Sequence, residues 1–259
     1  RVGVRTQSFG FSTVLLVFIA GIASIAAFAV GMTLTLSVIL EFVTRAAQPI
    51  AVTFDPLGVS LATAAVGALV VIYHARIVSK RSASVRSATR LASAAVSLAV
   101  AATGVGVTVN ALLASSTNAI IAGDIRNLLL GGLSALVVGG VLWWVTWSPR
   151  GASTPERVTT PGRSAYLVVI FGLSALVALI TLLVIGFQLF SFLLDGGSGE
   201  TFIERSRQAL GLLTATVLVA SYHFGIWRND RASDVAPENV RRIDRITLVA
   251  SIDSAELVD

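Results

Sequence analysis

The stretch that decides the fold is residues 163–228, RSAYLVVIFGLSALVALITLLVIGFQLFSFLLDGGSGETFIERSRQALGLLTATVLVASYHFGIWR. It contains two apolar segments without a charged residue, 164–194 and 208–227, separated by a polar turn. Each is long enough to cross the roughly 30 Å hydrocarbon core of a bilayer as a helix, which takes about 20 residues. A backbone in lipid must pair its own N–H and C=O groups, so both segments are expected to be α-helical.

The same pattern of a long apolar segment, a polar turn and a second apolar segment occurs three times. Uncharged segments also cover residues 6–40 and 56–75, and then residues 91–123 and 127–149. A paired-helix unit that recurs along a chain is typical of repeat architectures. The sequence therefore predicts an all-α fold, an integral membrane bundle of six transmembrane helices within residues 1–228. These are expected to form three tandem helix hairpins, over residues 6–75, 91–149 and 164–227.

The composition excludes an ordinary soluble globule. Hydrophobic residues make up 55% of the chain and charged residues only 13%, against about a quarter charged residues in soluble domains. The absence of Cys excludes disulfides and thiolate metal sites. The pI near 10.6 would also fit a nucleic-acid-binding protein. The basic residues are clustered between apolar segments, however, so we expect no nucleic-acid partner.

The placement of lysine and arginine predicts the orientation. Most of them lie at the N-terminus, after the second and fourth predicted helices, and in the tail. By the positive-inside rule, both termini are expected in the cytoplasm. All Trp and Tyr residues lie near the same predicted helix ends, where amphipathic rings prefer the headgroup zone. The predicted location is the bacterial cytoplasmic (inner) membrane, as a multi-pass protein.

The tail differs from the rest of the chain. Residues 229–242 are polar and contain Pro237, which predicts a cytoplasmic linker. Residues 243–250 are rich in β-branched side chains, and Asp253 with Glu256 forms a capping-box pattern. We expect residues 243–259 to be the start of a small cytoplasmic βα unit that continues beyond Asp259, because one such unit cannot bury its own faces.

The two histidines, His74 and His223, occupy equivalent positions in the second and sixth predicted helices. Two imidazoles at one depth could ligate haem iron or the magnesium of a chlorin. The more ordinary interpretation is a Tyr–His pair in the interfacial belt, because Arg76 and Arg228 mark the membrane edge beside them. The equivalent residue in the middle pair, Trp144, is not a metal ligand.

No predicted helix carries Asp, Glu, Lys or Arg in its middle, which argues against an ion-coupled transporter. Asn110 and Gln188 remain as candidates for interhelical hydrogen bonds or for the lining of a small pore. Small residues at Gly131, Ala135 and Gly139 would let another helix approach closely, from within the bundle or from a partner subunit. The candidates for binding anionic lipid headgroups are Arg76, Lys80, Arg81, Arg86 and Arg90.

The third pair contains, in order, Arg163, Tyr166, Gly172-Leu173 and Tyr222-His223-x-x-x-Trp227-Arg228. On these residues the chain resembles a family of uncharacterised bacterial polytopic membrane proteins of tandem helix pairs, known as a domain of unknown function. The resemblance is best over residues 162–231 and weaker in the first two pairs. It implies a six-helix membrane unit and brings no assigned activity.

The expected function is non-catalytic, as a scaffold or accessory subunit of a larger membrane complex. The expected partners are the lipid bilayer and other membrane subunits or further copies of the chain. The sequence contains no phosphate-binding Gly loop, nucleophile elbow or HExxH motif, so we expect no enzyme activity. Two alternatives remain open. A passive channel or small-solute carrier predicts a polar cavity around Asn110 and Gln188, and a haem- or chlorin-binding subunit predicts a pigment held by His74 and His223.

Overall fold

The protein is described by a computed structural model over residues 11–44, 50–117, 122–147, 161–196 and 201–234. These residues form one short helix, α2 (Ile50–Phe54), and six long ones. The long helices are α1 (Phe11–Thr44), α3 (Leu57–Ser79), α4 (Ala83–Thr117), α5 (Ala122–Trp147), α7 (Pro161–Leu194) and α8 (Phe202–Asp234). No strand occurs within these ranges, which confirms the predicted all-α fold there. The predicted βα unit at residues 243–259 lies outside the described residues.

Each of the six long helices is long and apolar enough to cross a membrane, which confirms the predicted number of candidate spans. Large apolar side chains point outward along them, and the side chain of Leu183, for example, is 76% exposed. A surface of this kind is unstable in water and stable against lipid tails. The chain is therefore a multi-pass protein that sits in a lipid bilayer.

The helices pack through small residues. The fully buried positions include Ser60, Ser97, Ser134 and Ser206, and the larger side chains of Leu167 and His223 are buried to the same degree. Each of these serine hydroxyls donates to a carbonyl three or four residues earlier in its own helix, so none of the four is left without a hydrogen bond where two helices meet. Small interfacial residues let helix backbones approach closely, which is how helices associate in lipid.

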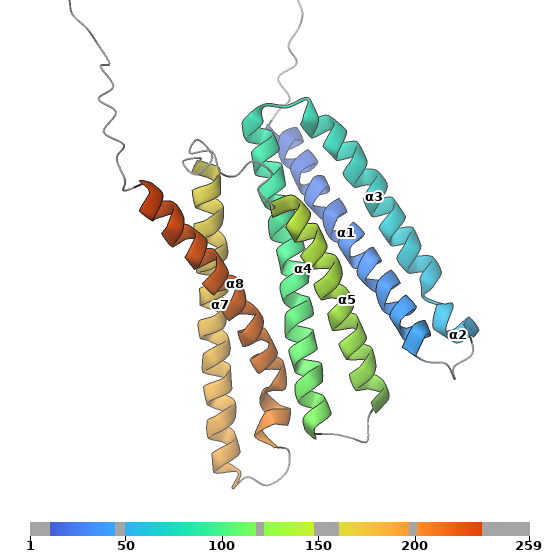
Figure 1. Cartoon of the computed structure of the whole chain (residues 1–259), viewed down its shortest axis with the longest axis vertical. Coiled ribbons are helices and arrows are strands. Elements are labelled where there is room, and N and C mark those ends of the chain that lie inside the picture. Colours follow the sequence, from blue (N-terminus) through green and yellow to red (C-terminus); the bar gives the residue numbers. More distant parts are fainter. Residues whose placement is uncertain (1–10, 45–49, 118–121, 148–160, 197–200, 235–259) are drawn as a thin grey trace, which may run out of the picture.

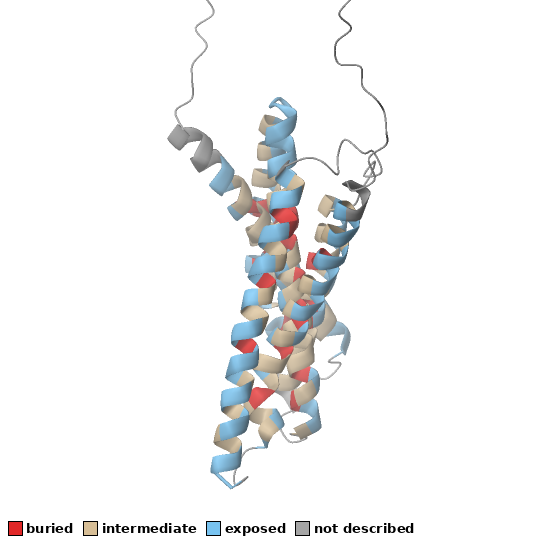
Figure 2. Cartoon of the chain, turned by 90° about the vertical axis from the view of Figure 1, so that its left-hand side faces the viewer, coloured by how far each residue is buried: buried red, intermediate tan, exposed pale blue. Residues whose placement is uncertain are grey.

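Helices that follow one another in the chain pack as pairs, α1 with α3, α4 with α5 and α7 with α8. The pairs stand in a row (Figure 1), in which α4 also contacts α8 and α1, and α1 also contacts α5. Helices α3 and α7 form the two edges of the row. Figure 2 shows buried positions along the inner faces of the helices and exposed positions on the outer faces.

Glycines set the closest approaches between helices. A Cβ atom added at Gly139 of α5 would collide with the backbone of Ala101 in α4, and one added at Gly104 would collide with Leu136 in α5. Gly31 of α1 approaches Ala64 of α3 in the same way. Helix α4 thus uses Gly104 on its α5 side, and it uses Gly106 on another side, where that residue meets Gly211 of α8.

The helix ends differ from the predicted boundaries. Helix α4 begins at Ala83, inside the stretch interpreted as a basic loop, and α8 continues to Asp234, so residues 229–234 of the predicted linker are helical. The remainder of that linker, 235–242, lies outside the described residues. The prediction was wrong at these ends because an uncharged window marks only the lipid-facing part of a helix. Arginine is a good helix former and allows the helix to continue into the polar zone.

The turn between α7 and α8 follows its sequence signals. The Thr201 hydroxyl accepts from the Glu204 backbone N–H at 3.3 Å, and the Glu204 carboxylate accepts from the Thr201 backbone N–H at 3.2 Å. The sequence pattern Thr201-x-x-Glu204 predicts such a capping box at the start of a helix, and the two hydrogen bonds confirm it. Gly196 takes the left-handed conformation with φ +66°, and Asp195 pairs with Arg205 at 2.7 Å.

Candidate functional site: an aromatic and histidine cluster at one end of the bundle

Five rings from three helices are in contact. We call them the aromatic cluster: Trp143 and Trp147 from α5, Tyr166 from α7, and Tyr222 and His223 from α8. Helix α5 ends, α7 begins and α8 ends towards the side of the bundle that holds the basic α3–α4 turn (Figure 1). Trp143 and Trp147 share one helix face because they stand four residues apart. Tyr166 lies near the start of α7 and His223 near the end of α8, so the antiparallel pairing of these helices brings them to one level.

The rings are in direct contact. Trp147 stacks on Tyr166 with ring centroids 5.0 Å apart, and Trp143 meets Tyr222 edge-on at 5.3 Å. His223 lies 5.8 Å from the Tyr166 ring and 6.0 Å from the Trp147 ring. Offset and edge-to-face pairs at these separations add about 0.5–1.5 kcal/mol each beyond the area that they bury. Tyr166 is 8% exposed and His223 0% exposed, whereas Tyr222 is 44% exposed, so the cluster has a buried centre and an open side at Tyr222.

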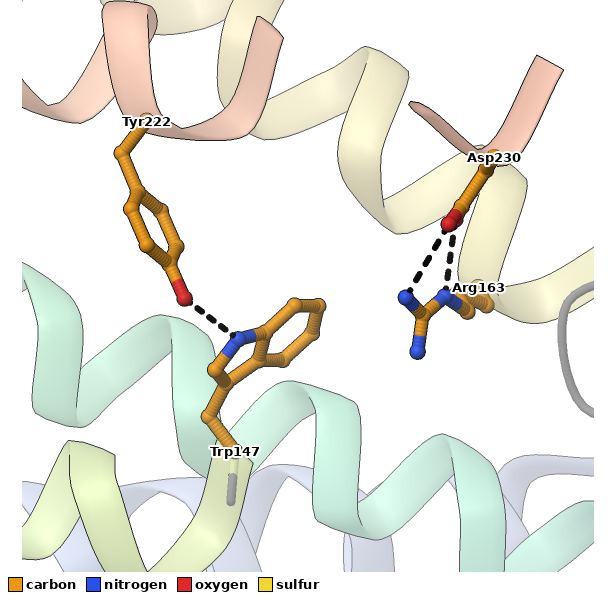
Figure 3. Close-up of polar contacts among 4 residues, drawn as sticks. All are labelled: Trp147, Arg163, Tyr222 and Asp230. Atoms are coloured by element: carbon orange, nitrogen blue, oxygen red, sulfur yellow. Dashed lines mark hydrogen bonds and ion pairs between the residues drawn. The ribbon is translucent and has the colours of Figure 1, made fainter. Parts of the chain in front are cut away.

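Two polar contacts orient the rings. The Trp147 indole Nε1 donates to the Tyr222 hydroxyl at 3.1 Å and joins α5 to α8 (Figure 3). His223 Nδ1 lies 2.8 Å from the Val219 carbonyl oxygen in its own helix. A carbonyl only accepts, so Nδ1 carries the proton, and in a neutral ring Nε2 is an acceptor that points away from α8.

Three polar atoms of the cluster have no hydrogen-bond partner among the described residues. They are Trp143 Nε1, the Tyr166 hydroxyl oxygen and His223 Nε2. The Trp143 indole interacts with the Tyr166 hydroxyl, but in a geometry that falls short of a direct hydrogen bond. Buried polar groups without partners are uncommon in folded proteins and each calls for an explanation.

Charged residues of α7 and α8 contact one another and tryptophan rings in and beside the cluster. Arg163 of α7 donates to the Asp230 carboxylate of α8 at 3.0 and 3.3 Å (Figure 3). The same guanidinium lies 5.7 Å from the Trp147 ring centroid, within cation–π range. A second such contact places Arg231 at 4.8 Å from the Trp227 ring in α8.

His74 lies away from the aromatic cluster. Its Nδ1 is 2.8 Å from the Val70 carbonyl oxygen, and its ring faces Gly21 of α1. Helix α3 stands at one edge of the row, whereas α8 lies beyond α4 towards the other (Figure 1). The structure therefore does not bring His74 and His223 together. In the part of the chain that it describes, no group of three or more His, Cys, Asp or Glu residues is placed to hold a metal ion.

The pore candidates lie on the two helices that pack against α8. The backbone of Asn110 in α4 lies beside Gly211 of α8, and Gln188 belongs to α7. Each has a buried side-chain oxygen without a hydrogen-bond partner among the described residues. The Thr108 hydroxyl of α4 and the Tyr166 hydroxyl of α7 share this property.

The three small residues predicted as a packing face of α5 do not all lie against a neighbouring helix. Gly139 and Ala135 face α4, against Ala101 and Gly104 respectively. A Cβ at Gly131 would meet nothing within 4 Å, and it is its neighbour Gly132 that packs on Thr108. Two of the three residues proposed as a packing face therefore lie inside the chain's own α4/α5 pair, and the third faces outward.

The five basic residues around the α3–α4 turn are exposed. Arg86 Nη1 donates to the Arg81 carbonyl oxygen at 2.7 Å, and Arg90 Nε donates to the Thr146 carbonyl oxygen of α5 at 2.6 Å. Arg90 therefore helps to hold α4 against α5. Arg76 lies in the last turn of α3, and Lys80 caps that helix through its backbone N–H.

The family described as "Domain of unknown function (DUF5671)" matches residues 89–222, which is more than half of the 259-residue chain. The chain belongs to this family. The DUF5671 match runs from the first turns of α4 to Tyr222 in α8, and the α1/α3 pair precedes it. It includes the second helix pair, where we expected the resemblance to be weaker. No curated protein and no solved structure matches the chain.

Sequence reasoning placed the Trp and Tyr residues of the cluster at the membrane edge and did not connect them. The signal that could have connected them is the spacing of Trp143 and Trp147, which puts two large rings on one face of a helix. It also missed the pairing of Arg163 with Asp230, because Asp230 was assigned to a linker.

Proposed function

We propose that this DUF5671 protein is a non-catalytic scaffold or accessory subunit of a larger membrane assembly. The observation that carries the proposal is the open row of helices. A path enclosed by a single chain would need the two edge helices, α3 and α7, to close a ring. They stand instead on opposite sides of the row (Figure 1). An open row presents two long apolar edges to lipid and to neighbouring subunits.

The distribution of charge supports the same proposal. Along the described helices, Asp, Glu, Lys and Arg occur only near the ends, as with Arg90, Arg126, Arg163 and Arg207. Pumps and proton relays use ionisable groups at membrane depth, which are costly there and are kept for function. The interior of the spans is occupied by packing groups, so its role is to hold the helices together.

Helix α7 is the edge that best suits a neighbour. It is the most apolar of the six candidate spans and the least buried within the chain. Phe187 and Leu194 are among its many exposed large side chains, whereas its buried side faces α8. We infer that a partner subunit or a second copy of the chain covers part of this edge.

We infer the location and orientation from the charges at the helix ends. The exposed basic α3–α4 turn lies at the same end as the start of α7 and the end of α8 (Figure 1). The positive-inside rule assigns this end to the cytoplasm of a bacterial cell. The three helix pairs are best understood as repeats of one hairpin unit, since each pair consists of a long helix followed by an antiparallel partner.

The test is the native mass and absorption spectrum of the complex after gentle solubilisation. One chain has a mass of 27.0 kDa. A colourless particle that is much heavier, and in which other membrane proteins or further copies are identified, is the expected result. A colourless particle that contains one chain and no partner would contradict the scaffold proposal.

A passive channel or carrier is the second candidate. The side-chain oxygens of Asn110 and Gln188, which have no hydrogen-bond partner among the described residues, favour it, because polar groups at membrane depth that lack partners can line a water-filled path. An open row would have to oligomerise to enclose that path. Solute flux into vesicles that falls for Asn110→Leu and Gln188→Leu, at equal protein content, would favour this candidate over the scaffold.

The pigment-binding candidate is favoured only by the free Nε2 of His223. A ligating histidine commonly donates its other nitrogen to a carbonyl, as both His74 and His223 do. The two residues belong to different helix pairs, so each would have to ligate a separate pigment. A Soret or chlorin band that is lost in His74→Ala or His223→Ala would establish this function.

A further inference from the structure

We propose that the aromatic cluster holds one internal water molecule that links α5, α7 and α8. The proposal starts from three atoms, Trp143 Nε1, the Tyr166 hydroxyl and His223 Nε2, which are buried without a hydrogen-bond partner among the described residues. Two of their side chains are more than nine-tenths buried. They come from three different helices and belong to one cluster, in which the Tyr166 and His223 rings lie 5.8 Å apart and Trp143 packs beside Tyr166.

The chemistry of the three atoms is complementary to a single water. Trp143 Nε1 can only donate, and His223 Nε2 can only accept, because Nδ1 donates to Val219. The Tyr166 hydroxyl can do either. A water molecule accepts from the indole, donates to the imidazole and uses a remaining position for the phenol. Buried waters typically make about three such bonds to groups that would otherwise be unsatisfied.

The relation between Trp143 and Tyr166 supports the same bridge. The Trp143 indole is close enough to the Tyr166 hydroxyl to interact with it, but the two groups do not have the geometry of a direct hydrogen bond. Polar groups that face each other beyond direct hydrogen-bond range are commonly joined by a water between them. The backbones of α5 and α7 do not lie side by side in the row, so the water would tie α5 to the α7/α8 pair where only side chains reach across.

The first test is whether the substitution Tyr166→Phe lowers or raises the thermal stability of the protein. Removing a buried hydroxyl that is bonded destabilises a protein, whereas removing one that is unsatisfied is neutral or stabilising. We expect Tyr166→Phe in the full chain, in lipid nanodiscs, to lower the Tm by about 2–4 °C. An unchanged or higher Tm would overturn the proposal. Tyr222→Phe, which removes a directly bonded hydroxyl, should lower the Tm, and Tyr73→Phe at a 63% exposed site should not.

The second test separates a bridging water from a direct bond between Tyr166 and either neighbour. Magnetisation transfer from water to the Trp143 indole proton, measured on ¹⁵N-Trp-labelled protein, should report a long-lived water. We expect the transfer to persist in Tyr166→Phe, because Trp143 and His223 still provide two bonds. Transfer that is absent in the wild type would show that no water is held there, and transfer that disappears in Tyr166→Phe would show that the exchanging phenol proton of Tyr166, and not a bound water, contacts the indole.

Discussion

Arg163 in the first turn of α7 and Asp230 in the last turns of α8 form an ion pair through two hydrogen bonds, at 3.0 and 3.3 Å. The guanidinium of the same arginine lies over the Trp147 ring of α5. One side chain therefore joins three helices at one end of the bundle. This contact gives a reason for α8 to continue beyond its apolar segment, since Asp230 must be held on the helix to reach Arg163.

We expect Asp230→Asn to lower the free energy of unfolding by about 1 kcal/mol, the scale of a charge-assisted hydrogen bond at a partly exposed site. Thermal unfolding of the purified protein measures the change. Asp195→Asn is the matched control at the opposite end of the same helix pair, where Asp195 is 51% exposed and Arg205 26%, and its effect should be smaller. Additive effects of Arg163→Gln and Asp230→Asn in the double variant would contradict a coupled pair.

Substitution of the adjacent glycines Gly139 and Gly140 of α5 should destabilise the protein at the first position and not at the second. A side chain at Gly139 collides with the Ala101 backbone, whereas one at Gly140 meets nothing within 4 Å. Gly139→Val should lower stability by about 1–3 kcal/mol, the usual result of overpacking, and Gly140→Val should be close to neutral. Monodispersity and Tm in detergent measure both. Equal effects of the two substitutions would mean that α4 and α5 do not approach as described.

Gly211→Val should loosen the α7/α8 pair from the rest of the bundle. A Cβ at Gly211 would collide with the Gly106 carbonyl oxygen of α4, so the substitution separates α8 from α4 without touching the α4/α5 interface. Hydrogen exchange should increase in α7 and α8 and remain unchanged in α4 segments that face α5. Gly225→Val in the same helix, where a Cβ meets nothing within 4 Å, is the control. An equal increase in α1 and α3 would indicate global unfolding instead.

Both histidines should be found with the proton on Nδ1. His74 and His223 each place Nδ1 2.8 Å from a carbonyl oxygen four residues earlier, and a carbonyl can only accept. The ¹⁵N chemical shifts of the two imidazoles in labelled protein identify the tautomer directly. Since these are the only histidines in the chain, His74→Gln assigns both signals. A proton found on Nε2 of His223 would contradict the ring orientation described for the cluster.

Cysteine labelling can test the orientation because the chain has no natural Cys. Ser82 lies in the α3–α4 turn and Thr201 at the start of α8, and both are exposed at opposite ends of the helices. In intact cells, a membrane-impermeant maleimide should label Thr201→Cys, and it should label Ser82→Cys only after permeabilisation. The reverse pattern would overturn the inferred orientation, and labelling of both in intact cells would contradict a spanning α3 or α8.

Much of the fold could be predicted from local signals. The uncharged segments located the six long helices, and Thr201 with Glu204 marked the start of α8, because both features depend on residues close together in the chain. The helix ends were less predictable. Asp230 lies in a polar stretch of the sequence, and nothing close to it in the chain indicates that this stretch is helical. Its ion-pair partner, Arg163, is far away in sequence.

The candidate site was predicted only in part for the same reason. His223 was singled out, but its equivalence to His74 in the repeat suggested a shared site that the row of helices does not form. The neighbours that matter to His223 are Trp147 and Tyr166, on other helices. Gly131 and Gly132 differ by one position on the helix surface, and sequence spacing alone could not show which of them faces α4.

By itself, the sequence determined that the chain is a six-helix membrane protein. Its apolar segments are unstable in water, and in lipid their backbone groups must pair within each segment. Both effects depend only on composition and segment length. Only the tertiary structure decided which helices are neighbours, which glycines meet a backbone, and which polar atoms of the five rings are buried without a partner among the described residues. Those features depend on the rotation and order of the helices in the row. Contacts between residues far apart in the chain set that arrangement, and no single segment contains it.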